Sequence, residues 1–140
     1  MRDKPLNLEV DLYQNVMDYV DQGGILPILQ EEKTGSIFGL KYGNLTKGSN
    51  WAVGLYYAII EKYSAVDYLA DNHWARWDYS EYSSKASRLT NMKGFEFTAS
   101  YAFDEHILIK LRAFFVEQII NERIAKETGN RIRMELIAKF

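Results

Sequence analysis

Charged side chains alternate with apolar ones in the last segment of the chain, with Ile137 as the one exception. Arg131, Arg133 and Glu135 alternate with apolar residues, so they fall on one face of an extended strand. Rings of lysine and arginine side chains on the wall of a channel attract anions. The alternation elsewhere in the chain gives further charged residues a similar position. The candidates to line a polar wall are Lys41, Glu96, Lys110, Arg112, Arg131, Arg133 and Glu135.

These charges have two interpretations. The first is a basic patch that favours anionic solutes. The second is a charge ladder, neutralised by Glu96 and Glu135, that keeps the wall polar, and we favour it. The expected hairpin registers place Arg112 opposite Arg133, Lys110 opposite Glu135, and Glu96 opposite Arg112.

A second group of polar and aromatic residues lies in the long segment 64–92. Its members are Asp67, Asp71, Trp74, Trp77 and Asp78. Tryptophan faces suit sugars, and carboxylates suit hard cations. The spacing matches no calcium-loop pattern. We favour a loop that folds inward or packs against its neighbours.

Several classes of chemistry are excluded by composition or lack support. The chain has no cysteine, which excludes disulfides and thiolate chemistry. Its two histidines, His73 and His106, lie far apart, and its net charge of −2 gives no case for nucleic acid. Glu31 and Glu32 sit in a polar segment, and neither a phosphate-binding loop nor a nucleophile elbow is present. We expect no enzymatic activity, cofactor or metal.

The alternation predicts an all-β domain over residues 1–140. Six strands are expected, at 4–16, 36–45, 51–63, 90–103, 107–118 and 129–140. A competing interpretation uses the helical spacing of apolar residues in 50–70 and 107–126. It predicts a soluble α+β domain that binds a small ligand or a partner protein.

Loop lengths and aromatic positions favour an antiparallel up-and-down segment of a transmembrane barrel. The expected connections are long at 18–35, 64–92 and 119–129, and short at 44–50 and 104–106. Outer-membrane barrels have short periplasmic turns and long extracellular loops. With Phe140 in the periplasm, aromatic girdles form at both ends of the apolar face. They comprise Tyr42, Trp51 and Phe103 at the periplasmic end, and Phe38, Phe95 and Phe115 at the outer end.

Three pieces of the sequence carry a resemblance to a known family. They are Lys41-Tyr42-Gly43 with Trp51 after the turn, Trp74-Ala75-Arg76-Trp77, and the ending Thr128–Phe140. From about residue 5 onward the chain resembles the C-terminal part of the bacterial outer-membrane "putative porin" family. The resemblance implies a β-barrel that forms a passive diffusion channel for small hydrophilic solutes in the outer membrane.

The resemblance also implies an assembly signal and a larger structure. Ile132, Met134, Leu136 and Phe140 would form the signal read by the barrel-assembly machinery, although Ala138 is smaller than the residue usual at its position. Six strands are fewer than the roughly eight with which bacterial single-chain barrels begin. We therefore expect the C-terminal portion of a larger porin. A subunit that closes a barrel with other copies and a truncated gene product are the alternatives. The N-terminus lacks a signal-peptide core, so an exported protein would be a mature form or a fragment.

Overall fold

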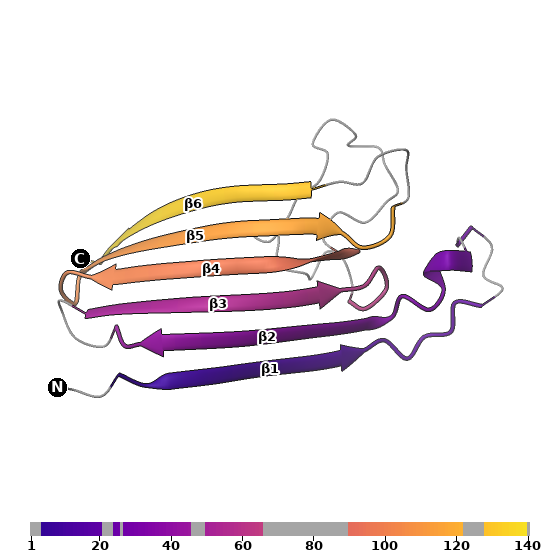
Figure 1. The fold of residues 1–140 in the computed structure, drawn as a ribbon, viewed down its shortest axis with the longest axis horizontal. Helices are drawn as coiled ribbons and strands as arrows, with labels where there is room; N and C mark the ends of the chain where they lie inside the picture. The colour runs from indigo at the N-terminus through magenta and orange to yellow at the C-terminus, as the bar shows by residue number, and fades with distance from the viewer. Residues whose placement is uncertain are drawn as a thin grey trace.

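Six antiparallel strands form one continuous sheet in the computed structural model (Figure 1), which describes residues 4–20, 24–25, 27–45, 50–65, 90–121 and 128–139. Each strand pairs with the next one in the chain. Within the described residues, β1 and β6 each have a single neighbour, so the sheet is open. The elements are β1 (Leu6–Gln14), η1 (Pro27–Leu29), β2 (Thr34–Gly43), β3 (Asn50–Ile60), β4 (Met92–Ala102), β5 (Ile107–Gln118) and β6 (Thr128–Ala138).

The all-β, up-and-down arrangement expected from the alternation is confirmed, and strand boundaries differ from expectation by a few residues. The helical interpretation of 50–70 and 107–126 is wrong for the described parts, because Asn50–Ile60 and Ile107–Gln118 are strands. Both are rich in β-branched and aromatic residues and have paired neighbours on each side. Ladder hydrogen bonds and half-buried packing therefore outweigh the helical spacing.

The connections separate by length to opposite ends of the sheet. The links β1–β2, β3–β4 and β5–β6 lie at one end, while β2–β3 and β4–β5 lie at the other, together with both termini (Figure 1). We call these the long-connection end and the short-turn end. This is the alternation of lengths expected from the sequence.

Hydrogen bonds join successive connections at the long-connection end. Asn15 Nδ2 donates to the carbonyl oxygen of Tyr63 at 2.7 Å. Asn91, at φ 60°, donates to the carbonyl oxygen of Ile120 and accepts from its backbone N–H, both at 2.9 Å. Asparagine tolerates this left-handed conformation better than most residues. These bonds tie the β1–β2 connection to β3–β4, and β3–β4 to β5–β6.

One expected register is confirmed and one is wrong. Between β5 and β6, Arg112 lies opposite Arg133 and Lys110 opposite Glu135, as expected. Between β4 and β5, Arg112 lies opposite Thr98, two residues away from the expected Glu96. The expected register would pair Phe103 with Glu105 and leave one residue for the turn, which conflicts with the connection expected at 104–106. Instead, the backbone N–H of Phe103 donates to the carbonyl oxygen of Ile107 at 2.9 Å, so the turn holds three residues. A register shift of two residues leaves every side chain on the same face of the sheet.

The two faces of the sheet have opposite character. The apolar face carries large hydrophobic side chains from all six strands, and they are exposed: Leu8, Val10, Phe38, Leu40, Leu55, Phe95, Phe97, Leu111, Phe115, Ile132 and Met134. The polar face carries the charged candidates together with a buried cluster of Met92, Phe114 and Val116. Burial therefore lies on the face with the charges, which inverts the usual arrangement of a one-sided sheet in water.

The turn between β4 and β5 generates a prediction. Asp104 Oδ1 accepts backbone N–H bonds from His106 at 2.8 Å and Ile107 at 2.7 Å. These bonds lower the pKa of Asp104 from its ordinary value of 3.8. Because the folded pKa is the lower one, the stabilisation is present above the unfolded pKa and is lost as pH falls through the folded pKa. Asp104→Ala should destabilise the hairpin at neutral pH and weaken its acid dependence below about pH 3.8.

Unfolding curves of the two chains in detergent between pH 2 and 7 would check this. Asp104→Asn is the matched control, because it keeps an acceptor oxygen but not the charge. It should be more stable than Asp104→Ala and equally insensitive to acid in this window. Equal acid dependence in wild type and Asp104→Ala would contradict the prediction.

Candidate functional site

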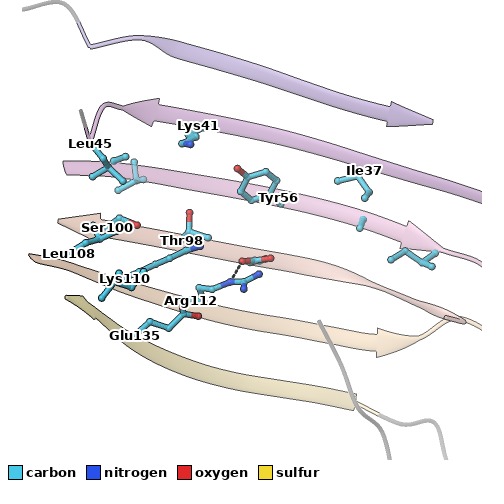
Figure 2. Close-up of a pocket in the computed structure, with 16 residues that line it drawn as sticks. Ile37, Lys41, Leu45, Tyr56, Thr98, Ser100, Leu108, Lys110, Arg112 and Glu135 are labelled. Carbon is cyan, nitrogen blue, oxygen red and sulfur yellow. Dashed lines mark hydrogen bonds and ion pairs between the residues drawn. The ribbon is translucent and has the colours of Figure 1, made fainter. Parts of the chain in front are cut away.

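The polar face is hollowed by a cavity of about 490 Å³ (Figure 2). Side chains from β2 to β6 line it. Hydroxyl groups come from Tyr56, Thr98 and Ser100, and cationic groups from Lys41, Lys110 and Arg112. Strand alternation positions them, since the residues between them point to the apolar face. The remaining lining is apolar and includes Ile37, Leu108 and Ile137, so the hollow combines polar groups at its centre with apolar walls.

A buried ion pair crosses β4 and β5 inside this hollow. Arg112 Nε donates to Glu96 Oε1 at 2.5 Å, and the Glu96 residue is only 5% exposed. The two residues are diagonal neighbours in the ladder, because Glu96 lies opposite Phe114. A buried charge is costly without a partner, so each group compensates the charge of the other.

A second ion pair lies on the edge strand. Arg133 Nε donates to Glu135 Oε1 at 2.9 Å, and both side chains are more exposed than the buried pair. Arg133 and Glu135 are two residues apart on β6 and therefore share the polar face. These two pairs support the charge-ladder interpretation over an unneutralised patch for Arg112 and Arg133. Among the described residues, Lys41 and Lys110 form no ion pair, although Lys110 lies opposite Glu135.

Arg131, the remaining basic candidate, stacks on a buried ring. The guanidinium carbons of Arg112 and Arg131 lie 4.9 and 5.0 Å from the ring centroid of Phe114, which is fully buried. Cation–π attraction favours this arrangement. Within the described part of the chain, Nε and Nη2 of Arg131 are buried and have no hydrogen-bond partner. Among the charged candidates in the described residues, Arg131 is thus the one with buried nitrogens that lack a hydrogen-bond partner.

The polar face also includes residues that the sequence analysis did not single out. Glu9 and Asp11 of β1 stand at alternate positions between exposed apolar residues, and both are exposed. Alternation with Leu8 and Val10 is a signal that could have identified them. Phe114 could not have been found in this way, because a phenylalanine within an apolar run gives no sign of facing the charges.

On the apolar face, one predicted girdle forms a straight row. Phe38, Tyr57, Phe95 and Phe115 lie directly opposite one another across four strands. The Tyr57 and Phe95 ring centroids are 4.6 Å apart. Two residues further toward the long-connection end, Lys93 Nζ and Glu117 Oε1 form an ion pair at 3.3 Å. The aromatic row therefore marks the boundary between apolar and charged surface.

The other girdle gathers near the short-turn end. The ring centroids of Tyr42 and Trp51 are 5.6 Å apart, and those of Tyr101 and Phe103 are 4.8 Å apart. Lys4 Nζ lies 3.5 Å from the centroid of the Trp51 ring. A lysine therefore lies next to the aromatic residues at this end of the sheet, as Lys93 does at the opposite end. Aromatic side chains with an adjacent charge are typical of surfaces that meet a polar–apolar boundary.

The assembly-signal candidates lie on the apolar face of the edge strand. Ile132, Met134 and Leu136 are 70–76% exposed. Phe140 lies outside the described residues, as do Asp67, Asp71, Trp74, Trp77 and Asp78. The proposed roles of all these residues stay predictions.

Comparison with protein-family models, with curated proteins and with solved structures found no match. In the described ranges, no helix has the length and hydropathy needed to cross a bilayer. No group of three or more potential metal ligands occurs in the same ranges.

The ion pair between Glu96 and Arg112 generates a prediction. Arg112→Met leaves the Glu96 carboxylate buried without its partner, which should cost about 3–5 kcal/mol of unfolding free energy. The double variant Glu96→Gln/Arg112→Met removes both charges and should recover most of that loss. Denaturant titration of the folded protein in detergent measures both.

A matched control is Arg133→Met, which removes the guanidinium of the more exposed pair. Its cost should stay below about 1 kcal/mol. Equal losses for the Arg112 and Arg133 variants would show that burial does not set the strength of these pairs.

Proposed function

We propose that this chain forms part of the wall of an outer-membrane porin, a passive channel for small hydrophilic solutes. The proposal rests on the inverted polarity of the two faces of the sheet. An exposed apolar face spans all six strands, and the opposite face is charged, partly buried and hollowed. Soluble proteins rarely expose apolar patches of such extent. Lipid on one side and an aqueous lumen on the other account for both faces.

The height of the apolar face supports the same proposal. The aromatic residues extend from Phe95 on β4 to Phe103 directly after it, which is about 26 Å along an extended chain at about 3.3 Å per residue. A strand tilt of about 35–45° shortens this to a height of roughly 20 Å, close to the apolar band of about 25 Å of outer-membrane barrels. Charged groups begin just beyond both aromatic rows, at Lys93 and Lys4. The short-turn end would face the periplasm.

The lumen proposed here is polar without a strong charge preference. In the ion pairs Glu96–Arg112 and Arg133–Glu135, the carboxylate offsets the charge of the guanidinium group, so each pair adds no net charge to the wall. Lys41 and Lys110 add positive charge close to hydroxyl groups. Selection would therefore rest on solute size and polarity, with weak attraction for anions.

The direct test is reconstitution. The chain is refolded in detergent, its β content is read by circular dichroism, and it is added to liposomes loaded with a fluorescent hydrophilic dye. We expect a β spectrum that requires detergent, and dye release. A folded, monodisperse protein in plain buffer, with no release from liposomes, would overturn the proposal.

A substitution pair tests which face meets lipid. Leu55→Lys places a charge on the exposed apolar face, and should reduce membrane insertion by about 2–4 kcal/mol near the bilayer midplane. Tyr56→Lys is the control, because it is the next residue on β3, points to the polar face and lies opposite Glu96. It should insert nearly as well as the wild type. The folded fraction in liposomes, measured across a urea series, reports both effects.

The opposite ranking would contradict lipid contact. If the apolar face met water, Leu55→Lys would improve solubility and leave folding intact, because a lysine costs little on an exposed strand position.

A further inference from the structure

We propose that the two open edges of this sheet pair with each other between copies of the chain, so that β1 of one copy continues the sheet of the next copy at β6. The inference starts from unpaired backbone. Within the described residues, β1 pairs only with β2, and β6 only with β5. An edge strand presents unpaired N–H and C=O groups that template the addition of another strand. The inference rests on the proposed function to the extent that edges cannot stay open in lipid.

Strand direction and length permit this pairing. Six strands in up-and-down order make β1 and β6 antiparallel to each other. The edges are nine and eleven residues long. An antiparallel partner is therefore supplied by any second copy that lies beside the first with the same orientation.

Charge complementarity identifies the occupant of each edge. On the polar face, β1 presents Glu9 and Asp11, whereas β6 presents Arg131 and Arg133. Within the described residues, neither Glu9 nor Asp11 forms an ion pair, and Arg131 keeps two buried nitrogens without an acceptor. Arg133 already pairs with Glu135 on its own strand, so the acidic edge of one copy offers an acceptor to Arg131 of the next copy. Opposite charges across a strand pair stabilise it, and like charges destabilise it.

One register brings opposite charges together on the polar face and apolar side chains together on the apolar face. Placing Asp11 opposite Arg131 also places Glu9 opposite Arg133. On the apolar face, the same register brings Leu8 opposite Met134 and Val10 opposite Ile132. A shift of two residues in one direction would instead place Glu9 opposite Glu135, which repels. Two copies paired in this way join their described strands into one sheet of twelve, more than the roughly eight with which bacterial single-chain barrels begin.

Disulfide trapping tests the pairing, because the chain has no cysteine of its own. Two singly substituted chains with tags of different size, Leu8→Cys and Met134→Cys, are mixed unfolded, refolded together in detergent and oxidised. Directly opposite strand residues have the Cα spacing that a disulfide requires. We expect a cross-linked species that contains both tags. Leu8→Cys mixed with Ile132→Cys or Leu136→Cys tests the neighbouring registers and should give less product.

Charge exchange tests the complementarity in the same assay. Arg131→Glu in the Met134→Cys chain should lower the yield about tenfold, because an attraction becomes a repulsion. Asp11→Arg in the Leu8→Cys chain should restore it. Lys41→Glu is the matched control: it makes the same change on the polar face of an interior strand and should leave the yield unchanged.

The remaining outcomes of the cross-linking experiment would overturn either the pairing between copies or its register. No mixed product, with a β spectrum showing that both chains folded, excludes pairing between copies. A double variant Leu8→Cys/Met134→Cys that cross-links only within one chain means self-closure. A higher yield with Ile132→Cys or Leu136→Cys overturns the register. Dye release without cross-linking would refute this inference alone, and cross-linking without dye release would refute only the channel.

Discussion

The antiparallel ladder imposes a strict period of two, and nearly every property of this molecule depends on it. A slip of one residue in any strand would move its charged side chains to the apolar face and its leucines into the hollow. The registers of the five strand pairs keep parity from β1 to β6, so that Leu8, Leu40, Leu55, Phe97 and Ile132 remain on one surface. The short turns help to hold this parity. The three-residue turn at Asp104 sets the pairing of β4 with β5.

Inverted polarity places the strongest electrostatic interactions where water is partly excluded. Glu96 and Arg112 are buried on the side that carries the charges, and the ring of Phe114 lies beneath two guanidinium groups. Arg112 is thus held from two directions, by a carboxylate and by an aromatic face. The charge on this face is also uneven: β1 carries only carboxylates, Glu9 and Asp11, whereas the guanidinium groups lie on β5 and β6, and Glu96 and Glu135 pair with two of them.

Local alternation was enough to predict the six strands, the sides on which their residues lie, and the alternation of connection lengths. It was enough for the β5–β6 register too, because Arg112 and Arg133 each stand near the middle of a strand. It failed for the β4–β5 register, because a direct pairing of Glu96 with Arg112 is incompatible with the three-residue turn that the sequence also predicted at 104–106. Helical spacing in 107–126 was misleading, since a continuous apolar run such as Ala113–Val116 fits both periods. The stacking of Arg131 on Phe114 joins two strands through packing, and strand-by-strand periodicity carries no information about it.

An even number of strands has a consequence for how such a unit can multiply. Both ends of the chain lie at the short-turn end, so the last strand finishes where the first one starts (Figure 1). Two units joined head to tail by a brief linker would keep the up-and-down order, the sidedness of every residue and the placement of long connections at one end. Duplication within a gene could therefore lengthen the sheet in steps of six strands without rebuilding a single hairpin.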